Sequence, residues 1–164
     1  MLNMPLSDPV VSNTTPLISL AEVGLMDVLA SLYSEIWIPQ AVYHEYQAGL
    51  PHRPFRPSLA QFSWITIHTA IYDPAIPATL DPGETEAIAL ARAQHARLIL
   101  IDEHRGRTVA ARLGLYVAGS LAVLIEAKKH GFIHLVQPYI DQMIAQGRYI
   151  APSLRQHVLD LSSE

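Results

Sequence analysis

The sequence of 164 residues contains no cysteine. Without thiols the chain can form neither a disulfide framework nor a thiolate metal site, which agrees with a cytoplasmic protein. No apolar run approaches the ~20 residues that a transmembrane helix needs. Residues 1–8 lack a basic stretch followed by an apolar one, so we expect no secretory signal.

Charge is also scarce, since only 16% of the residues are charged while 50% are hydrophobic. This composition is typical of one globular domain with a sizeable core. The formal net charge is −4, whereas a protein that holds duplex nucleic acid over a broad surface is usually basic. Any nucleic acid must therefore meet a local basic patch. Divalent cations are another means of handling phosphates, because they reverse the sign of the local field.

The most informative segment is residues 97–103, which read RLILIDE. Four consecutive aliphatic residues predict a strand buried on both faces, as in a parallel sheet. The strand ends on Asp102 and Glu103, and ligands bind at the carboxyl ends of strands in open parallel sheets. An acid there needs a compensating group, which could be a metal ion, an arginine or a helix end. The structural alternative is that Asp102 caps the next helix.

Short strands alternate with helices along most of the chain. We expect strands at 9–12, 36–38, 64–67, 97–101 and 115–118, and helices near 16–23, 25–32, 39–48, 81–95, 105–113 and 121–129. Two further helices are entered near Pro138 and Pro152. This order predicts an α/β fold with three α/β/α layers around a parallel sheet of about four to five strands. We expect a single domain over 1–164, with its core at 9–131 and a C-terminal helical extension at 132–164.

Three glutamates lie on predicted helices beside the core. Glu45 joins the margin of an apolar stripe, where a carboxylate either needs a partner or covers apolar surface with its stem. Glu84 stands where the acid of a capping box belongs, because Asp81 can cap the helix, so we interpret Glu84 as structural. Glu86 begins a segment that is apolar around its whole circumference. It has no evident structural duty, so we interpret it as functional.

Asn13 ends the first predicted strand. Thr14 or Thr15 can cap the helix that follows, and Pro16 suits its first position. Asn13 is then either a turn residue or a ligand. Its side chain offers a neutral carbonyl oxygen to a hard cation and cannot act as a base.

The candidate residues Asn13, Glu45, Glu86 and Asp102 come from four separate elements. All lie near strand C-termini or helix N-termini, which converge on one edge of a parallel α/β fold. Three uncompensated carboxylates in one cleft repel one another strongly. Mg²⁺ or Mn²⁺ would offset that repulsion and matches ligands that are all oxygen.

Four segments in order resemble motifs of the PIN-domain superfamily, and specifically a prokaryotic branch of it. They are residues 10–18 (VVSNTTPLI), 38–45 (IPQAVYHE), 80–91 (LDPGETEAIALA) and 98–107 (LILIDEHRGR). The resemblance implies a Mg²⁺- or Mn²⁺-dependent ribonuclease, and many relatives are toxins of toxin–antitoxin pairs. It also places Asn13, Glu45, Glu86 and Asp102 where the acidic quartet of the family lies. Asn13 departs from the usual aspartate.

Basic and polar residues follow Asp102 in the sequence. Arg105 or Arg107 could hold RNA phosphates beside the acids. Their structural alternative is a solvated helix face or ion pairs with Glu103. Ser120 matches, by the resemblance, a position where PIN proteins often carry a polar residue near the site, and it could instead be a helix N-cap.

The leading hypothesis is a PIN-type ribonuclease in which water attacks an RNA phosphodiester and leaves a 5′-phosphate and a 3′-hydroxyl. The expected partners are single-stranded RNA, a small antitoxin protein and a second copy of the chain, because surplus apolar surface tends to find a partner. One alternative is a catalytically inactive RNA- or protein-binding module of the same fold, which Asn13 favours. Another is a receiver-like signalling domain with Asp102 as phosphoacceptor, but Ser12 and Asn13 do not supply the acidic pair that receivers need.

Overall fold

The structure is a computed structural model that describes residues 8–164. Its centre is a five-stranded sheet with the strand order β3-β2-β1-β4-β5, in which all neighbours are parallel. The strands are β1 (Val10–Ser12), β2 (Ile36–Pro39), β3 (Ile65–His68), β4 (Leu98–Leu100) and β5 (Val117–Ala118). The first strand of the chain is therefore central, and the predicted parallel sheet is confirmed.

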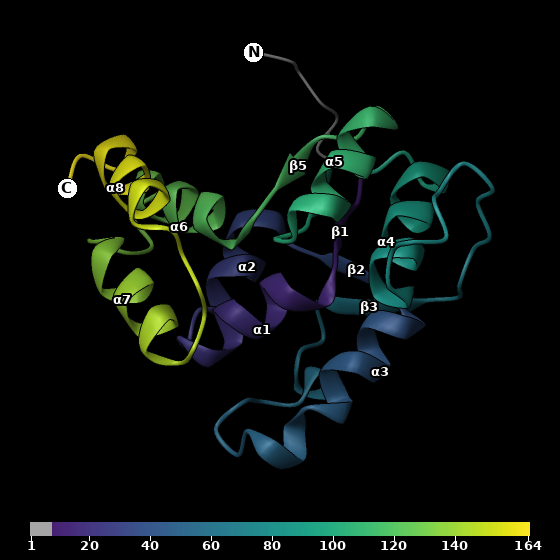
Figure 1. Cartoon of the computed structure of the whole chain (residues 1–164). Coiled ribbons are helices and arrows are strands. Elements are labelled where there is room, and N and C mark those ends of the chain that lie inside the picture. The colour runs from purple at the N-terminus through teal and green to yellow at the C-terminus, as the bar shows by residue number, and fades with distance from the viewer. Residues whose placement is uncertain (1–7) are drawn as a thin grey trace.

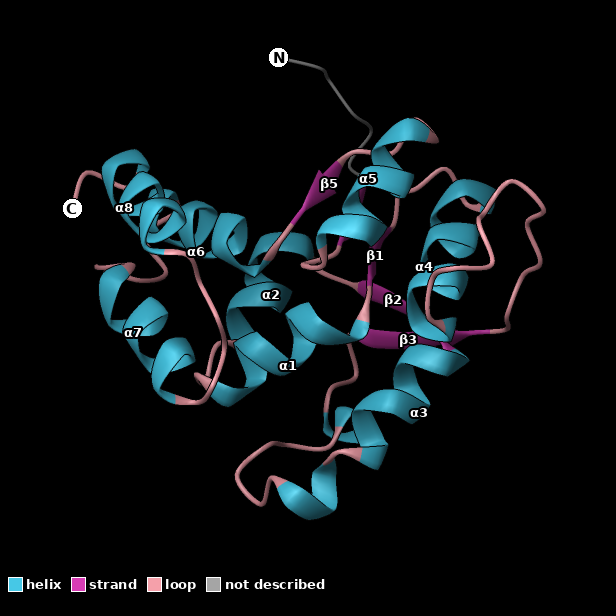
Figure 2. Cartoon of the chain, in the orientation of Figure 1, coloured by secondary structure: helices cyan, strands magenta, loops and turns pink. Residues whose placement is uncertain are grey.

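Helices cover both faces of this sheet (Figures 1 and 2). In the described residues they are α1 (Thr14–Glu22), α2 (Met26–Tyr33), α3 (Gln40–Ala48), α4 (Pro82–Ala93), α5 (His104–Arg112), α6 (Ser120–Lys129), α7 (Gln137–Ala145) and α8 (Pro152–Leu161). Helices α4 and α5 lie on one side of the sheet and α1, α2 and α6 on the other, while α3 contacts both α1 and α4 (Figure 1). Helices α7 and α8 lie beside α6, away from the strands (Figure 1).

The strands form the middle of one apolar core. The aliphatic side chains buried within them are Val10, Val11, Ile36, Ile38, Ile99 and Leu100. Because both faces of the sheet are covered by helices, these strands read as continuous aliphatic runs instead of alternating patterns. Helix α4 contributes Ala87, Ile88, Ala89, Leu90 and Ala91 to the same core, which explains its apolar circumference.

The first helix begins earlier than the sequence predicts, directly after β1. The N-cap residue of α1 is Asn13, whereas Thr14 and Thr15 are already helical and Pro16 is the third residue of the helix. The backbone N–H of Asn13 donates to the carbonyl oxygen of Leu100 at 2.9 Å. This bond extends the pairing of β1 with β4 by one residue and holds Asn13 at the carboxyl edge of the sheet.

No helix in the part of the chain that the structure describes is long and apolar enough to cross a membrane. Residues 1–7, which belong to the segment for which we expect no secretory signal, lie outside the described residues.

Candidate functional site

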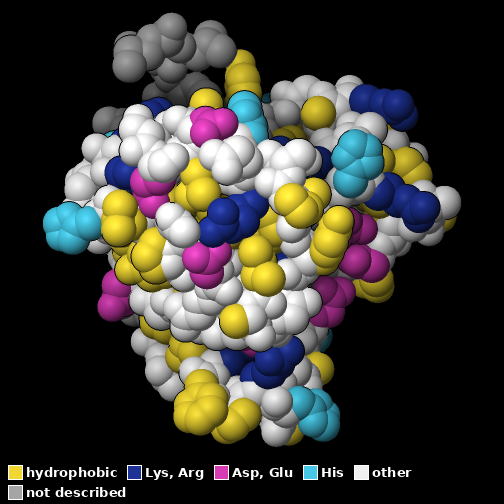
Figure 3. Space-filling view, turned by 60° about the vertical axis from the view of Figure 1, so that its left-hand side comes forward, with side chains coloured by type: hydrophobic (Ala, Val, Ile, Leu, Met, Phe, Trp, Pro, Cys, Tyr) yellow, Lys and Arg dark blue, Asp and Glu magenta, His cyan; other side chains and the backbone are white. Residues whose placement is uncertain are grey.

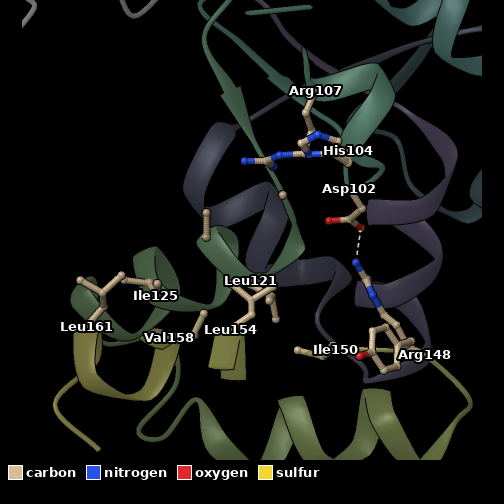
Figure 4. A pocket seen from close by; sticks show the side chains of 13 residues that line it. Asp102, His104, Arg107, Leu121, Ile125, Arg148, Ile150, Leu154, Val158 and Leu161 are labelled. Atoms are coloured by element: carbon tan, nitrogen blue, oxygen red, sulfur yellow. Dashed lines mark ion pairs between the residues drawn. The ribbon is translucent and has the colours of Figure 1, made fainter. Parts of the chain in front are cut away.

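Asp102 lies two residues beyond β4, and its side chain is only 8% exposed. The backbone N–H of Ser120 donates to Oδ1 of Asp102 at 2.7 Å, and the Ser120 hydroxyl lies 3.0 Å from both carboxylate oxygens. Nη2 of Arg148 lies 2.8 Å from Oδ2 of Asp102 (Figure 4). Of the three compensating groups that the sequence left open, the structure thus provides an arginine and a helix N-terminus.

The structural alternatives for Asp102 and Ser120 are both wrong. The N-cap residue of α5 is Glu103, and that of α6 is Gly119. Ser120 is instead the first residue of α6, where its hydroxyl and its N–H both face Asp102. Gly119 allows this approach, because a Cβ atom there would lie 2.7 Å from Oδ1 of Asp102 and 2.9 Å from Nη1 of Arg107.

Asn13 is buried, with 2% of its surface exposed. Its Nδ2 donates to Oε2 of Glu103 at 3.4 Å, and the hydroxyl of Thr15 donates to the other oxygen of Glu103. Oδ1 of Asn13 is buried and has no hydrogen-bond partner within residues 8–164. A buried oxygen without a partner costs about 1–3 kcal/mol. A hard cation is one kind of ligand that would satisfy this oxygen.

Glu45 connects the first turns of two helices. Its Oε2 accepts a hydrogen bond from the hydroxyl of Thr14 at 2.6 Å, and its Oε1 accepts one from the N–H of Gly83 at 3.0 Å. Because Thr14 directly follows Asn13, Glu45 lies beside the end of β1. The positive ends of α1 and α4 compensate its charge, and no lysine or arginine of the described residues forms an ion pair with it.

Glu86 has a structural duty that the sequence did not reveal. Its Oε2 accepts a hydrogen bond from the N–H of Ala41 at 2.9 Å, in the first turn of α3. The N-cap residue of α3 is Pro39, whose side chain cannot accept such a bond. Glu86 therefore caps α3 from a neighbouring helix, and the interpretation that it has no structural role is corrected.

Glu84 forms the capping box that the sequence predicts. The N–H of Glu84 donates to Oδ1 of Asp81 at 2.8 Å, and the N–H of Asp81 donates back to Oε2 of Glu84 at 3.3 Å. Burial raises the pKa of the Glu84 carboxyl, and the negative charges of Asp81 and Glu103 raise it further, while the hydrogen bond from Asp81 and the charge of Arg105 oppose them. Glu84 and Glu103 are therefore close enough to repel, so acids do approach one another at this edge.

The two arginines predicted to contact substrate differ in position. Arg107 donates from Nη1 to the carbonyl oxygen of Ile101 at 3.0 Å, next to Asp102. Arg105 is exposed and donates to the carbonyl oxygen of Thr79 at 3.3 Å. The alternative of ion pairs with Glu103 is not found for either arginine in the described part of the chain.

A pocket of about 520 Å³ opens beside Asp102. Figure 4 shows Arg148 paired with Asp102, while Arg107 lies on the other side of Asp102 and has no ion pair drawn to it. The apolar wall comes from α6 and α8 and consists of Leu121, Ile125, Leu154, Val158 and Leu161. On the face drawn in Figure 3, basic side chains are scattered among apolar and acidic ones and do not gather into one patch.

The structure brings the four candidate residues to the region of the carboxyl edge without assembling them. Asn13 and Asp102 follow the neighbouring strands β1 and β4, Glu45 is linked to the residue after Asn13, and Glu86 faces α3. Among residues 8–164, no group of three or more His, Asp or Glu side chains is placed to hold a metal ion. The oxygen donors suit a hard cation, but Arg148 already occupies Asp102.

Sequence reasoning missed Arg148, Thr14 and Gly119. Arg148 lies in the helical extension and carries no motif, so no local pattern could relate it to Asp102. Thr14 was considered only as a cap of its own helix, although its hydroxyl is bound to Glu45. Gly119 precedes Ser120, and a glycine before a polar residue at a strand end could have indicated close packing.

Comparisons with known proteins agree with this architecture. A family model described as a PIN domain matches residues 9–164, including the C-terminal helices. No curated protein sequence matches the chain. Among solved structures, a PilT N-terminus domain protein from the hyperthermophilic archaeon Sulfolobus solfataricus P2 matches with a TM-score of 0.51 and 16% identity, over 72% of this chain and 92% of that chain. At this identity the likeness concerns the fold alone.

Proposed function

This chain belongs to the PIN-domain family, and we propose that it is a ribonuclease that depends on Mg²⁺ or Mn²⁺. The observation that carries the proposal is the position of Asn13 and Asp102 at neighbouring strand ends, with a buried amide oxygen that has no partner in the described residues. Oxygen donors of this kind are the ligands that hard dications prefer. The acidic net charge supports the same proposal, because a divalent ion reverses the local field for a phosphate.

We assign the metal ligands and the catalytic acids to Asn13, Glu45, Glu86 and Asp102. Oδ1 of Asn13 has no partner to give up, and Glu86 uses only Oε2 to accept the N–H of Ala41, whereas Asp102 must part from Arg148. A bound divalent ion would supply activation of water and stabilisation of the charge that develops on the phosphodiester. Because Asn13 is neutral, the site carries one negative charge fewer than an all-acidic quartet.

The remaining side chains would orient the reactants. Ser120 fixes the direction of the Asp102 carboxylate through its hydroxyl and its N–H. Arg107, at the wall of the pocket, would bind a phosphate of single-stranded RNA by its planar guanidinium. Arg105 is directed toward Thr79 and would contact the RNA at a point farther from Asp102.

Incubation of purified protein with end-labelled single-stranded RNA and MnCl₂ tests the proposal, with EDTA as the metal-free control. Cleavage that leaves a 5′-phosphate is expected, and Asp102→Asn should abolish it while circular dichroism remains that of the wild type. Asp141→Asn is the matched control, because Asp141 pairs with Arg155 on the C-terminal helices. Wild-type cleavage by the Asp102→Asn protein would remove Asp102 from the mechanism.

A second candidate function is favoured by the ion pair of Asp102 with Arg148. A carboxylate that is neutralised by an internal cation suits a catalytically inactive RNA- or protein-binding module. Fluorescence anisotropy with the same RNA separates the two functions, since such a module would bind RNA in Mn²⁺ without cutting it.

The toxin role, the small antitoxin partner, the homodimer and the cytoplasmic location stay predictions. Induced expression tests the first, because a toxic ribonuclease should arrest growth and its Asp102→Asn variant should not. Light scattering coupled to gel filtration gives the number of copies in solution.

A further inference from the structure

The segment 146–151, which connects α7 to α8, makes two side-chain contacts with α1 and one with Asp102 of the candidate site. Nε2 of Gln146 donates to the carbonyl oxygen of Glu22 at 2.9 Å, at the end of α1. Arg148 donates from Nη1 to the hydroxyl oxygen of Ser19 and places Nη2 at 2.8 Å from Oδ2 of Asp102. An arginine from the connection between α7 and α8 thereby joins α1 to Asp102, and Figure 4 shows its ion pair with Asp102.

We propose that Arg148 sets the affinity of this site for divalent cations, because its guanidinium and the ion compete for Asp102. The inference rests on the proposed function, since it takes Asp102 as a ligand. Ser120 already contacts both oxygens of the carboxylate, and Arg148 occupies the free side of Oδ2. An ion on that oxygen would lie close to the guanidinium, and two positive charges so near each other repel strongly where little water screens them.

The burial of Asp102 increases the effect of this competition on the affinity for the ion. The Asp102 side chain is 8% exposed, so a carboxylate that lost its internal cation would be poorly solvated and would gain from any replacement. Arg107 does not take the same position, because it donates to the carbonyl oxygen of Ile101 and forms no ion pair with Asp102 in the described residues. Arg148 is therefore the residue whose removal should expose Asp102 to a metal ion.

Isothermal titration with MnCl₂ compares the wild type, Arg148→Ala and Arg155→Ala. Arg155 is the matched control, because it also belongs to the C-terminal extension but lies on α8 and pairs with Asp141 at 2.7 Å. We expect Arg148→Ala to bind Mn²⁺ about tenfold more tightly or better, which is the scale of coupling between close charge pairs, and Arg155→Ala to match the wild type. Arg148→Lys keeps a positive charge and should stay near the wild type.

Equal or weaker binding by Arg148→Ala overturns the inference, as does the absence of Mn²⁺ binding in every variant. Hydrogen exchange of the wild-type protein provides a second measurement that does not depend on a variant that folds. Residues 146–151 should exchange faster when Mn²⁺ is bound, and unchanged exchange under saturating Mn²⁺ would count against competition. Failure of the proposed function looks different, because Mn²⁺ would then bind with the expected order of affinities while RNA stayed intact.

Discussion

Glu86 of α4 accepts a hydrogen bond from the N–H of Ala41 in α3, and Glu45 of α3 accepts one from the N–H of Gly83 in α4. Each helix thus caps the first turn of the other with a carboxylate. The exchange satisfies N–H groups that have no partner within their own helix. It also places both acids at the point where the two helices begin, so structural and functional roles for Glu45 and Glu86 are compatible.

Replacing Glu86 by alanine should destabilise the fold. The loss of an N-terminal cap costs about 1 kcal/mol, which corresponds to about 2–4 °C in Tm for a chain of this size. Glu86→Gln keeps an acceptor oxygen and should lose less. Thermal denaturation checks both variants, and a Tm of Glu86→Ala equal to that of the wild type would show that the contact with Ala41 contributes nothing. A loss of Mn²⁺ affinity in Glu86→Gln at unchanged Tm would reveal a ligand role.

Gly119→Ala should disturb the site more than the fold. The new Cβ would lie 2.7 Å from Oδ1 of Asp102 and 2.9 Å from Nη1 of Arg107, so both side chains must move. RNA cleavage should therefore fall by about tenfold or more, because misplacement of a catalytic group is costly. Gly49→Ala is the control, since its Cβ would lie 2.6 Å from Nη1 of Arg56, away from Asp102. Equal activity of both variants would contradict the prediction.

The parts of this fold that sequence predicts best are those with local signals. The run 98–101 is aliphatic throughout because both faces of its strand are covered, and this continuity predicts a buried parallel strand. The capping box of Asp81 and Glu84 is predictable because its two partners are three residues apart in the sequence. The contacts of Glu86 with Ala41 and of Asp102 with Arg148 join distant segments. The periodicity of hydrophobic residues in the sequence does not predict such contacts, because they arise only when whole helices pack against one another.

Residue roles at helix ends were predicted less well for a related reason. The sequence offers several residues that can cap, and tertiary contacts decide among them. Asn13 became the N-cap of α1 because its N–H pairs with Leu100 of β4. Ser120 is the first residue of α6 and not its N-cap, and both its hydroxyl and its N–H donate to Asp102.

Glu84 should make stability depend on pH. Burial and the nearby acids raise the pKa of Glu84 above its ordinary value of 4.5, so the folded protein binds this proton more tightly than the unfolded chain. The resulting contribution to the free energy of unfolding is complete below pH 4.5 and is lost as the pH rises through the raised pKa. Glu84→Gln keeps the capping box and removes the titration. The Tm of the wild type relative to Glu84→Gln should therefore fall as the pH rises from 4 to 7, and a constant difference would refute the assignment.

Glu164 should have the opposite dependence on pH. Its carboxylate accepts hydrogen bonds from the N–H groups of Val136 at 2.6 Å and Gln137 at 2.9 Å, at the start of α7, and from Nζ of Lys128 at 2.9 Å. Burial opposes ionisation, but these hydrogen bonds and the charge of Lys128 lower the pKa of Glu164 below 4.5. The stabilisation is therefore present above pH 4.5 and is lost as the pH falls through the lowered pKa.

Glu164→Gln should consequently lower the Tm at pH 7, and the deficit should shrink in acid as the wild-type carboxylate becomes protonated. Hydrogen bonds to a charged group contribute about 1.5–3 kcal/mol, so the effect at neutral pH is within the reach of thermal denaturation. Glu126→Gln is the control, because Glu126 pairs with Lys129 on the exposed side of α6. A deficit that does not shrink as the pH falls through the lowered pKa of Glu164 would mean that Glu164 acts by packing and not by its charge, since both side chains are neutral below that pKa.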